Sequence, residues 1–462
     1  MRRITRTRNE NLTEGPVGET LRRMTIPMIL GMVMMMSFGL VDTFFVSLLG
    51  TDQLAAISFT FPVTFTVISL NIGLGIGTSA IIGKLLGAGA NNDAKLHATG
   101  SLMLSVILVS SMATLGYFLI DPIFSLLNAS DNLMPYIRDY MGVWYLSSVF
   151  LSLPMVGNSV LRACGDTRTP SIIMACGGAL NAGLDPIFIF GFGPVPAMGI
   201  QGAAMATFFA WLIGAIWIVW FLAIRRGLMV PRLLNIAEFK ESARDVLKIG
   251  LPAAGANMLT PIAGAVMTAL VANYGAEAVA AWGVGNRLES IASIIILALS
   301  MTLPPLISQN VGADLHERVE AAYKLTLKFI LGWQLIVYVV LWLLSDWIAA
   351  IFANEHEVAQ LITLFLAIVP LGYGMQGVII LTNSSFNAMH MPMTALVLSI
   401  IRLFVFFVPV SYVGSLLFDI PGLFWGNVVA NIIMALISFI SFKRALLSRR
   451  AEAAESEEKV TL

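Results

Sequence analysis

Twelve long apolar segments constrain the fold of this chain more than any other feature of its sequence. Each is long enough to cross a membrane, because about 20 residues of helix at 1.5 Å per residue span a hydrocarbon core of roughly 30 Å. Charged residues make up only 12% of the 462 residues, against roughly 25% in soluble domains. A bilayer offers no water to exposed backbone groups, so we expect an all-α integral membrane protein. The segments cover 24–48, 54–85, 97–120, 132–161, 170–191, 199–224, 246–274, 277–311, 322–345, 357–388, 393–413 and 421–443.

Most of the Lys and Arg residues fall in or next to alternate connections between these segments. Basic residues stay on the cytoplasmic side of a membrane, and the alternation fits only an even number of spans. We therefore expect a multi-pass protein of the plasma (inner) membrane with both termini in the cytoplasm. The connections that contain no Lys or Arg are 50–53, 121–131, 191–198, 275–276, 345–356 and 414–420.

The two halves of the chain repeat each other at a shift of 225 residues. The shift superposes Pro27 on Pro252 and Gly50 on Gly275, without a gap. Six helices followed by six in the same orientation predict two lobes related as parallel repeats, with substrate bound near the membrane midplane between them. The expected domains are an N-lobe at 1–224 that includes a basic N-terminal segment, a cytoplasmic inter-lobe linker at 225–245, a C-lobe at 246–448 and a disordered cytoplasmic tail at 449–462.

Two acidic residues and one amide lie inside apolar segments of the first half. Asp42 lies in LVDTFFVSLL, and Asn181 and Asp185 lie four residues apart in LNAGLDPIFIF, hence on one face of a helix. Ionisable groups are costly inside a membrane, and they usually mark paths for ions, protons or charged substrates. The 225-residue shift places all three on apolar residues, which suggests that they serve chemistry and not the shared scaffold. These counterparts are Met267, Phe406 and Val410.

Several motifs resemble the multidrug and toxic compound extrusion (MATE) transporters, in particular their DinF-like branch. They are the proline fifteen residues before the acid in the first span, RACGDTRTP, N-x-x-x-D-P and GIQGAAMATF. The resemblance implies two six-helix lobes around a central cleft and secondary active multidrug efflux, in which organic cations leave by alternating access in exchange for protons or sodium ions. It also implies roles for five residues: Asp42, Asn181, Asp185 and Thr207 match cation-binding positions, and Pro27 matches a hinge.

The second half lacks the acidic residues that another branch of that family carries in helices 7 and 10, so we expect the ion chemistry in the N-lobe. Glu289 is the remaining deep acid of the C-lobe. Two interpretations of it stay open: a functional polar site, or a structural ion pair with Arg402.

The coupling ion also stays open between two choices, of which we favour the proton. A proton that neutralises either carboxylate removes the counter-charge of a bound cation and so releases it. The same two carboxylates, with an amide and a hydroxyl, form an all-oxygen set that could hold a sodium ion, and no other metal site is expected.

Three other function classes fit the sequence less well. A lipid-linked oligosaccharide flippase of a related superfamily would need intramembrane Arg or Lys for its anionic pyrophosphate, whereas the deep charges of the N-lobe are acidic. A channel would need a continuous ring of pore-lining groups. The chain has no nucleophile, phosphate-loop or zinc motif, so we expect no enzyme and no cofactor besides the coupling ion. The expected partners are small organic cations and the lipid bilayer, with no nucleic acid, and the expected state is a monomer.

Overall fold

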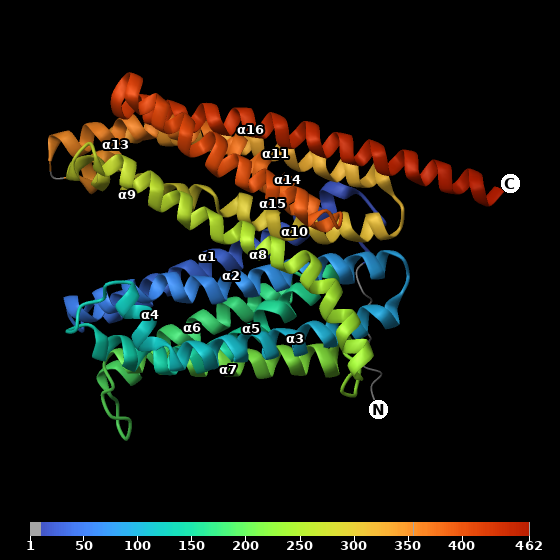
Figure 1. Ribbon diagram of the computed structural model, residues 1–462, viewed down its shortest axis with the longest axis horizontal. Helices are drawn as coiled ribbons and strands as arrows, with labels where there is room; N and C mark the ends of the chain where they lie inside the picture. Colours follow the sequence, from blue (N-terminus) through green and yellow to red (C-terminus); the bar gives the residue numbers. More distant parts are fainter. Residues whose placement is uncertain (1–10, 354, 462) are drawn as a thin grey trace. The chain divides into compact units, whose positions relative to one another are not determined.

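The computed structural model describes residues 11–353 and 355–461, the last ten by their backbone alone. Within these ranges it is helical with no β-strand, and the predicted all-α membrane fold is confirmed (Figure 1). The chain divides into two compact units, which we call the N-lobe and the C-lobe. The N-lobe holds Arg22–Ala254 together with residues up to Leu12, and the C-lobe holds Thr13–Leu21 and Gly255–Leu462. The basic residues Arg2, Arg3, Arg6 and Arg8 of the predicted N-terminal segment lie outside the described residues.

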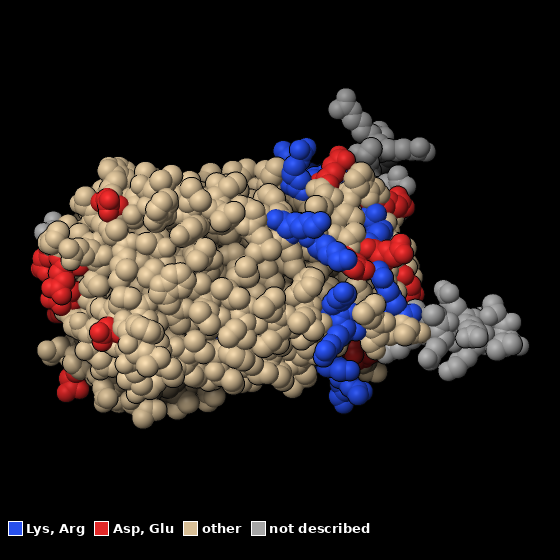
Figure 2. Space-filling model, turned by 90° about the horizontal axis from the view of Figure 1, so that it is seen from above, with Lys and Arg blue, Asp and Glu red and all other residues tan. Residues whose placement is uncertain are grey.

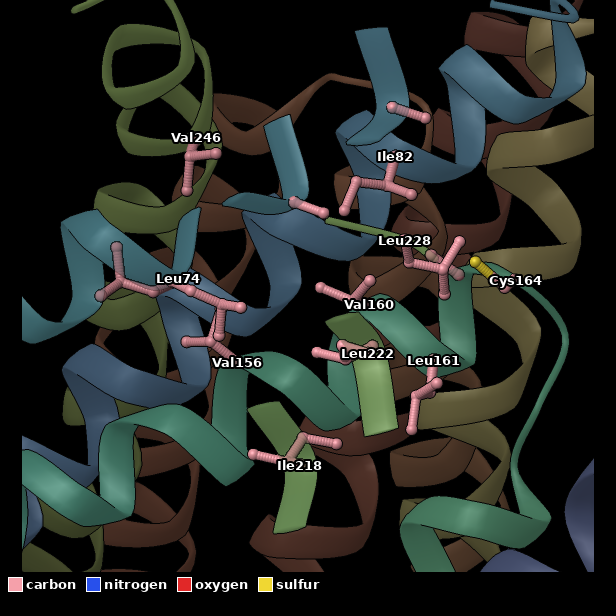
Figure 3. Packing of buried hydrophobic residues seen from close by; sticks show 14 of the residues in the cluster. Leu74, Ile82, Val156, Val160, Leu161, Cys164, Ile218, Leu222, Leu228 and Val246 are labelled. Atoms are coloured by element: carbon pink, nitrogen blue, oxygen red, sulfur yellow. The ribbon is translucent and has the colours of Figure 1, made fainter. Parts of the chain in front are cut away.

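Helix α5 is the centre of the N-lobe and packs against α2, α3 and α7 (Figure 1). Its buried face carries Val156 and Val160, which meet Leu74 of α2 and Ile218 of α7 (Figure 3). Cys164 lies in the same apolar cluster as a free, buried cysteine. The elements of this lobe are α1 Val17–Ser47, α2 Thr51–Gly87, α3 Asn91–Phe118, α4 Ile120–Leu126, α5 Met134–Ala163, α6 Arg168–Phe190, α7 Ile200–Trp220 and the π-helical turn η1 Phe221–Arg225.

The C-lobe begins within α8 and repeats the pattern of long apolar helices. Trp282, Phe365 and Phe424 pack ring against ring in its core. Its elements are α8 Ile236–Ala272, α9 Ala276–Ala292, α10 Ile294–Gly312, α11 His316–Leu343, α12 Ser345–Phe352, α13 His356–Ile368, the 3-10 turn η2 Val369–Gly372, α14 Tyr373–Ala388, α15 Pro392–Ile400, the π-helical segment η3 Ile401–Phe407 and α16 Val408–Thr461.

The described residues contain 11 helical stretches long and apolar enough to cross a membrane. The last of them, Pro392–Ala451, has 60 residues and contains two crossings. The backbone leaves helical geometry between these two, at Phe418 and at Asp419, whose φ is 53°. The apolar stretches thus agree with the twelve spans that the sequence predicts.

Two segments differ from their predicted form. Helix α8 begins at Ile236 and not at 246, so about half of the predicted linker is helix. Asn235 and Glu238 explain the early start, since each donates its backbone N–H to the other's side chain, over 3.0 and 2.8 Å, and these bonds occupy N–H groups that a helix start leaves unpaired. At the other end α16 continues to Thr461 where the sequence predicts a disordered tail, because Ala and Glu are good helix formers.

Charged side chains gather at the two ends of the face shown in Figure 2 and leave its middle without Lys, Arg, Asp or Glu. Lys and Arg lie at one end beside some Asp and Glu, whereas only Asp and Glu are visible at the opposite end. This is the distribution expected of helices that cross a membrane with basic connections on one side. Which end faces the cytoplasm stays a prediction.

Candidate functional site

Three helices of the N-lobe bring the predicted site residues together. Asp42 lies five residues before the end of α1, and Asp185 lies five residues before the end of α6. At 1.5 Å per residue both carboxyl groups are about 7 Å along the axis from the ends of their helices. Asn181 lies one turn earlier on α6, and Thr207 lies on α7. We call these four residues the N-lobe oxygen site.

Helix α1 lies against α6 because glycines remove side chains from their contact. A methyl group at Gly31 would lie 2.9 Å from the Cα of Ser171, and one at Gly178 would lie 2.7 Å from the ring of Phe38. Small residues allow this close approach of backbones in membrane helices. The Ser171 hydroxyl also donates a 3.6 Å hydrogen bond to the sulfur of Met28. This contact continues along α1 from the level of Met28 to Phe38, one turn before Asp42.

The two carboxyl groups face each other across this contact. Asp185 is fully buried, and neither of its carboxyl oxygens has a hydrogen-bond donor. Its neighbour is the half-buried carboxyl of Asp42, close enough for a hydrogen bond once one of the two carries a proton. Two ionised carboxylates have only acceptors and repel each other. The pair therefore suits a proton or a cation held between the two groups.

An amide and a hydroxyl complete the site. The Nδ2 of Asn181 donates a 3.2 Å hydrogen bond to the Oγ1 of Thr207. Thr207 in turn donates to the carbonyl of Ala203 one turn earlier, over 3.0 Å. The bond between Asn181 and Thr207 ties α6 to α7 beside the acids. The described residues contain no group of three or more His, Cys, Asp or Glu side chains arranged for a metal ion.

Tyr140 is a site residue that sequence reasoning missed. It lies on α5, near enough to both Asp42 and Asp185 to be affected by their charge. The only signal in the sequence was a phenol inside an apolar span, and tyrosines are common there. Its hydroxyl can both donate and accept, so it can serve either protonation state of the acids.

Helix α1 runs unbroken past Pro27, the predicted hinge. Proline lacks the N–H that would close a helical hydrogen bond, so this turn is weaker than its neighbours. The role of Pro27 as a moving hinge stays a prediction.

Glu289 of α9 has a different partner from the one that the ion-pair interpretation expects. Its Oε1 accepts a 2.9 Å hydrogen bond from the Nε2 of Gln376 on α14. Arg402, in η3, acts on Glu289 only as a nearby charge, and its Nε is buried without a hydrogen-bond partner. Glu289 is thus held by an amide and not by a direct ion pair, and Gln376 is a second residue that the sequence did not single out.

Comparison with known proteins gives consistent similarities over the whole chain. The profile of the MatE family matches residues 27–187 and 252–413, one stretch in each half. An FAD transporter of Shewanella oneidensis is 38% identical over 445 residues, which are 96% of this chain and 98% of the relative. The multidrug export protein MepA of Staphylococcus saprophyticus is 25% identical over 417 residues, 90% of this chain and 91% of that protein.

Among solved structures, the Vibrio cholerae MATE transporter VcmN in its bent form superposes with a TM-score of 0.89. The two sequences are 34% identical, and the match covers 94% of this chain and 97% of that one. The similarities in sequence and in fold therefore all lead to membrane transporters.

Proposed function

Since this chain belongs to the MatE family of transporters, we propose that it is a secondary active exporter driven by protons that bind at the N-lobe oxygen site. It is a multi-pass membrane transporter and not an enzyme. The observation that carries the proposal is the pair of facing carboxyl groups of Asp42 and Asp185, one of them fully buried without a hydrogen-bond donor. Binding of one proton stabilises such a pair most, because it removes the repulsion and allows a hydrogen bond between the two carboxyl groups.

The proton would enter from outside and bind between the two acids. Each charge that moves down a membrane potential supplies about 2.3 kcal/mol per 100 mV. A proton on either acid turns the repulsion between α1 and α6 into a hydrogen bond, so the packing of the outer end of α1 depends on the state of the site. We further propose that the protein lies in the plasma (inner) membrane with both termini in the cytoplasm. It would carry out transport as a monomer.

Pro27 lets the outer part of α1 respond to that change. Pro27→Ala should restore a helical hydrogen bond, stiffen α1 and lower the transport rate several-fold, with little change in substrate affinity. Transport by reconstituted protein and equilibrium binding, measured on the same preparation, separate these two effects. A Pro27→Ala protein that transports at the wild-type rate would remove the hinge from the mechanism.

Sodium remains the alternative coupling ion at the same residues. Carboxylate, amide and hydroxyl oxygens are ligands that hard cations prefer. The bond from Asn181 to Thr207 already joins the amide and the hydroxyl beside the acids.

Two relatives support different substrates. The multidrug export protein MepA supports organic cations, the substrates that the sequence resemblance implies. The FAD transporter supports a flavin dinucleotide, and its higher identity, 38% against 25%, favours this second candidate. The match to the MatE family leaves the lipid-linked oligosaccharide flippase without support.

The test uses purified protein in proteoliposomes, with either a pH gradient or a sodium gradient imposed. Ethidium and FAD are offered separately, and their movement is followed by fluorescence. The proposal predicts transport that depends on the pH gradient and is absent from Asp185→Asn. Movement that follows only the sodium gradient would assign sodium as the coupling ion, and movement that needs no gradient would refute coupling at this site.

A further inference from the structure

The C-lobe contains a second polar cluster that the ion-coupling site does not use. It consists of Glu289 on α9, Gln376 and Tyr373 on α14, and Arg402 in η3, and we call it the C-lobe polar cluster. Gln376 donates to Glu289, and both Tyr373 and Arg402 lie near enough to Glu289 to be affected by its charge. Tyr373 and Gln376 are three residues apart and so share one face of their helix.

This cluster lies at mid-depth in the lobe. Arg402 is ten residues from the start of α15, and Gln376 is twelve residues from the end of α14. A short connection joins the end of α14 to the start of α15. At 1.5 Å per residue, Arg402 and Gln376 therefore lie about 15–18 Å along their helices from this connection. A hydrocarbon core is roughly 30 Å thick. Arginine at such a depth is rare and usually serves function.

Two atoms of the cluster that can donate a hydrogen bond have no partner. The Nε of Arg402 is buried and has no hydrogen-bond partner. The hydroxyl of Tyr373, a residue only 1% exposed, has none either. Arginine has no acceptor at all, and a tyrosine hydroxyl brings one donor. A group that satisfies the Nε of Arg402 must therefore offer an acceptor, and the hydroxyl of Tyr373 can donate to the same group.

The local backbone sets Arg402 apart from an ordinary packing residue. It is the second residue of the π-helical segment Ile401–Phe407. Short π-helical segments within α-helices occur frequently at functional sites. Glu289 provides partial charge compensation for the buried guanidinium, which would be costly alone. Because Glu289 is held by Gln376, it leaves the donors of Arg402 available.

We propose that the C-lobe polar cluster binds an anionic group of the transported molecule, with Arg402 as the direct contact and Tyr373 as a second donor. The inference rests on the proposed export function and names the class of its substrate. A phosphate or pyrophosphate supplies only acceptors, and the guanidinium fork matches it well. Among the two candidate substrates, the cluster thus selects the flavin dinucleotide over a simple organic cation.

The experiment compares ligands that share one ring system and differ in phosphate. Binding of riboflavin, FMN and FAD to purified protein in lipid nanodiscs is measured by flavin fluorescence, and inorganic pyrophosphate is tested by the shift in melting temperature. The variants are Arg402→Gln, Arg402→Lys and Tyr373→Phe. The control is Arg138→Gln, which removes an arginine paired with Asp121 at the surface of the N-lobe, where both side chains are more than half exposed.

Arg402→Gln should weaken FAD binding at least about tenfold, since it removes a charge-assisted hydrogen bond. Riboflavin binding should stay within about twofold, FMN should be intermediate, and the pyrophosphate shift should vanish. Arg402→Lys should retain part of the FAD affinity, Tyr373→Phe should lose less than Arg402→Gln, and Arg138→Gln should match wild type.

Equal losses for riboflavin and FAD would show a purely structural role and overturn the inference. The same conclusion follows if wild-type protein responds to neither FAD nor pyrophosphate. Binding of pyrophosphate without FAD would keep the anion site and refute the flavin substrate. If Arg402→Gln does not fold, an Arg402→Lys protein with wild-type affinity for all four ligands would overturn the inference.

Discussion

The two lobes share a helical scaffold but contain opposite kinds of polar cluster. In the N-lobe two acids face each other, whereas in the C-lobe an acid is held by an amide near an arginine whose Nε has no hydrogen-bond partner. In the 225-residue repeat the counterpart of Asp42 is Met267. The counterparts of Glu289 and Arg402 in the first half are Thr64 and Gly177. Neither cluster is therefore a relic of the repeat. The difference suggests that one lobe binds the coupling ion and the other binds the charged part of the substrate.

The largest expected effect tests the acidic side of this comparison. Asp185→Asn and Asp42→Asn should each lower proton-driven transport at least about 100-fold, because an amide keeps the shape of the carboxyl and cannot take up a proton. Transport is measured in proteoliposomes under an imposed pH gradient, with melting temperature as the check on folding. Asp121→Asn is the control, since Asp121 is a half-exposed acid of the same lobe paired with Arg138. Wild-type transport by either site variant would give that acid a structural role.

A second prediction tests whether the acids depend on the close contact of α1 with α6. Gly31→Ala places a methyl group 2.9 Å from the backbone of Ser171, so α1 must move away. Transport should fall about tenfold and stability by about 1–3 kcal/mol, the usual range for overpacking. Gly39→Ala in the same helix is the matched control, because a methyl group there meets nothing within 4 Å. Equal behaviour of the two variants would show that the contact does not position Asp42.

A smaller effect is expected at the hydroxyl that ties α6 to α7. Thr207→Val removes the acceptor of the hydrogen bond from Asn181 and should lower transport about fivefold, which corresponds to a bond worth about 1 kcal/mol. Thr207→Ser should restore most of the rate. Initial rates at several pH values measure both variants. A serine variant as slow as the valine variant would assign the loss to packing.

The smallest predicted effect comes from Glu289, the acid of the C-lobe, and it is a gain in anion binding where the other variants lose function. Glu289→Gln leaves Arg402 without its compensating charge, so the unliganded protein should melt a few degrees lower. Pyrophosphate should bind about two- to threefold more tightly, because the site loses a repelling carboxylate. Ligand titrations followed by melting temperature measure both changes. Weaker pyrophosphate binding would mean that Glu289 contributes to the anion site through more than its charge.

Much of the fold could be predicted from the sequence, because hydrophobicity and length decide where helices cross a membrane. The start of α8 could not, since it depends on the reciprocal bonds of Asn235 and Glu238. Asp42 and Asp185 were recognisable because buried acids are costly. Tyr140 and Gln376 were not, because phenols and amides are common in such helices and acquire meaning only from their neighbours. The sequence left open whether Glu289 forms an ion pair with Arg402, because side-chain direction depends on packing and on the π-helical backbone of η3.

Proton exchange by the purified protein tests the central claim most directly. In weakly buffered solution, addition of a transported substrate should displace protons from wild-type protein, and a pH indicator dye records the change. The division of roles predicts the same signal from Glu289→Gln and no signal from Asp185→Asn. A signal that persists in Asp185→Asn, or one that is lost in Glu289→Gln, would contradict the assignment of ion coupling to the N-lobe.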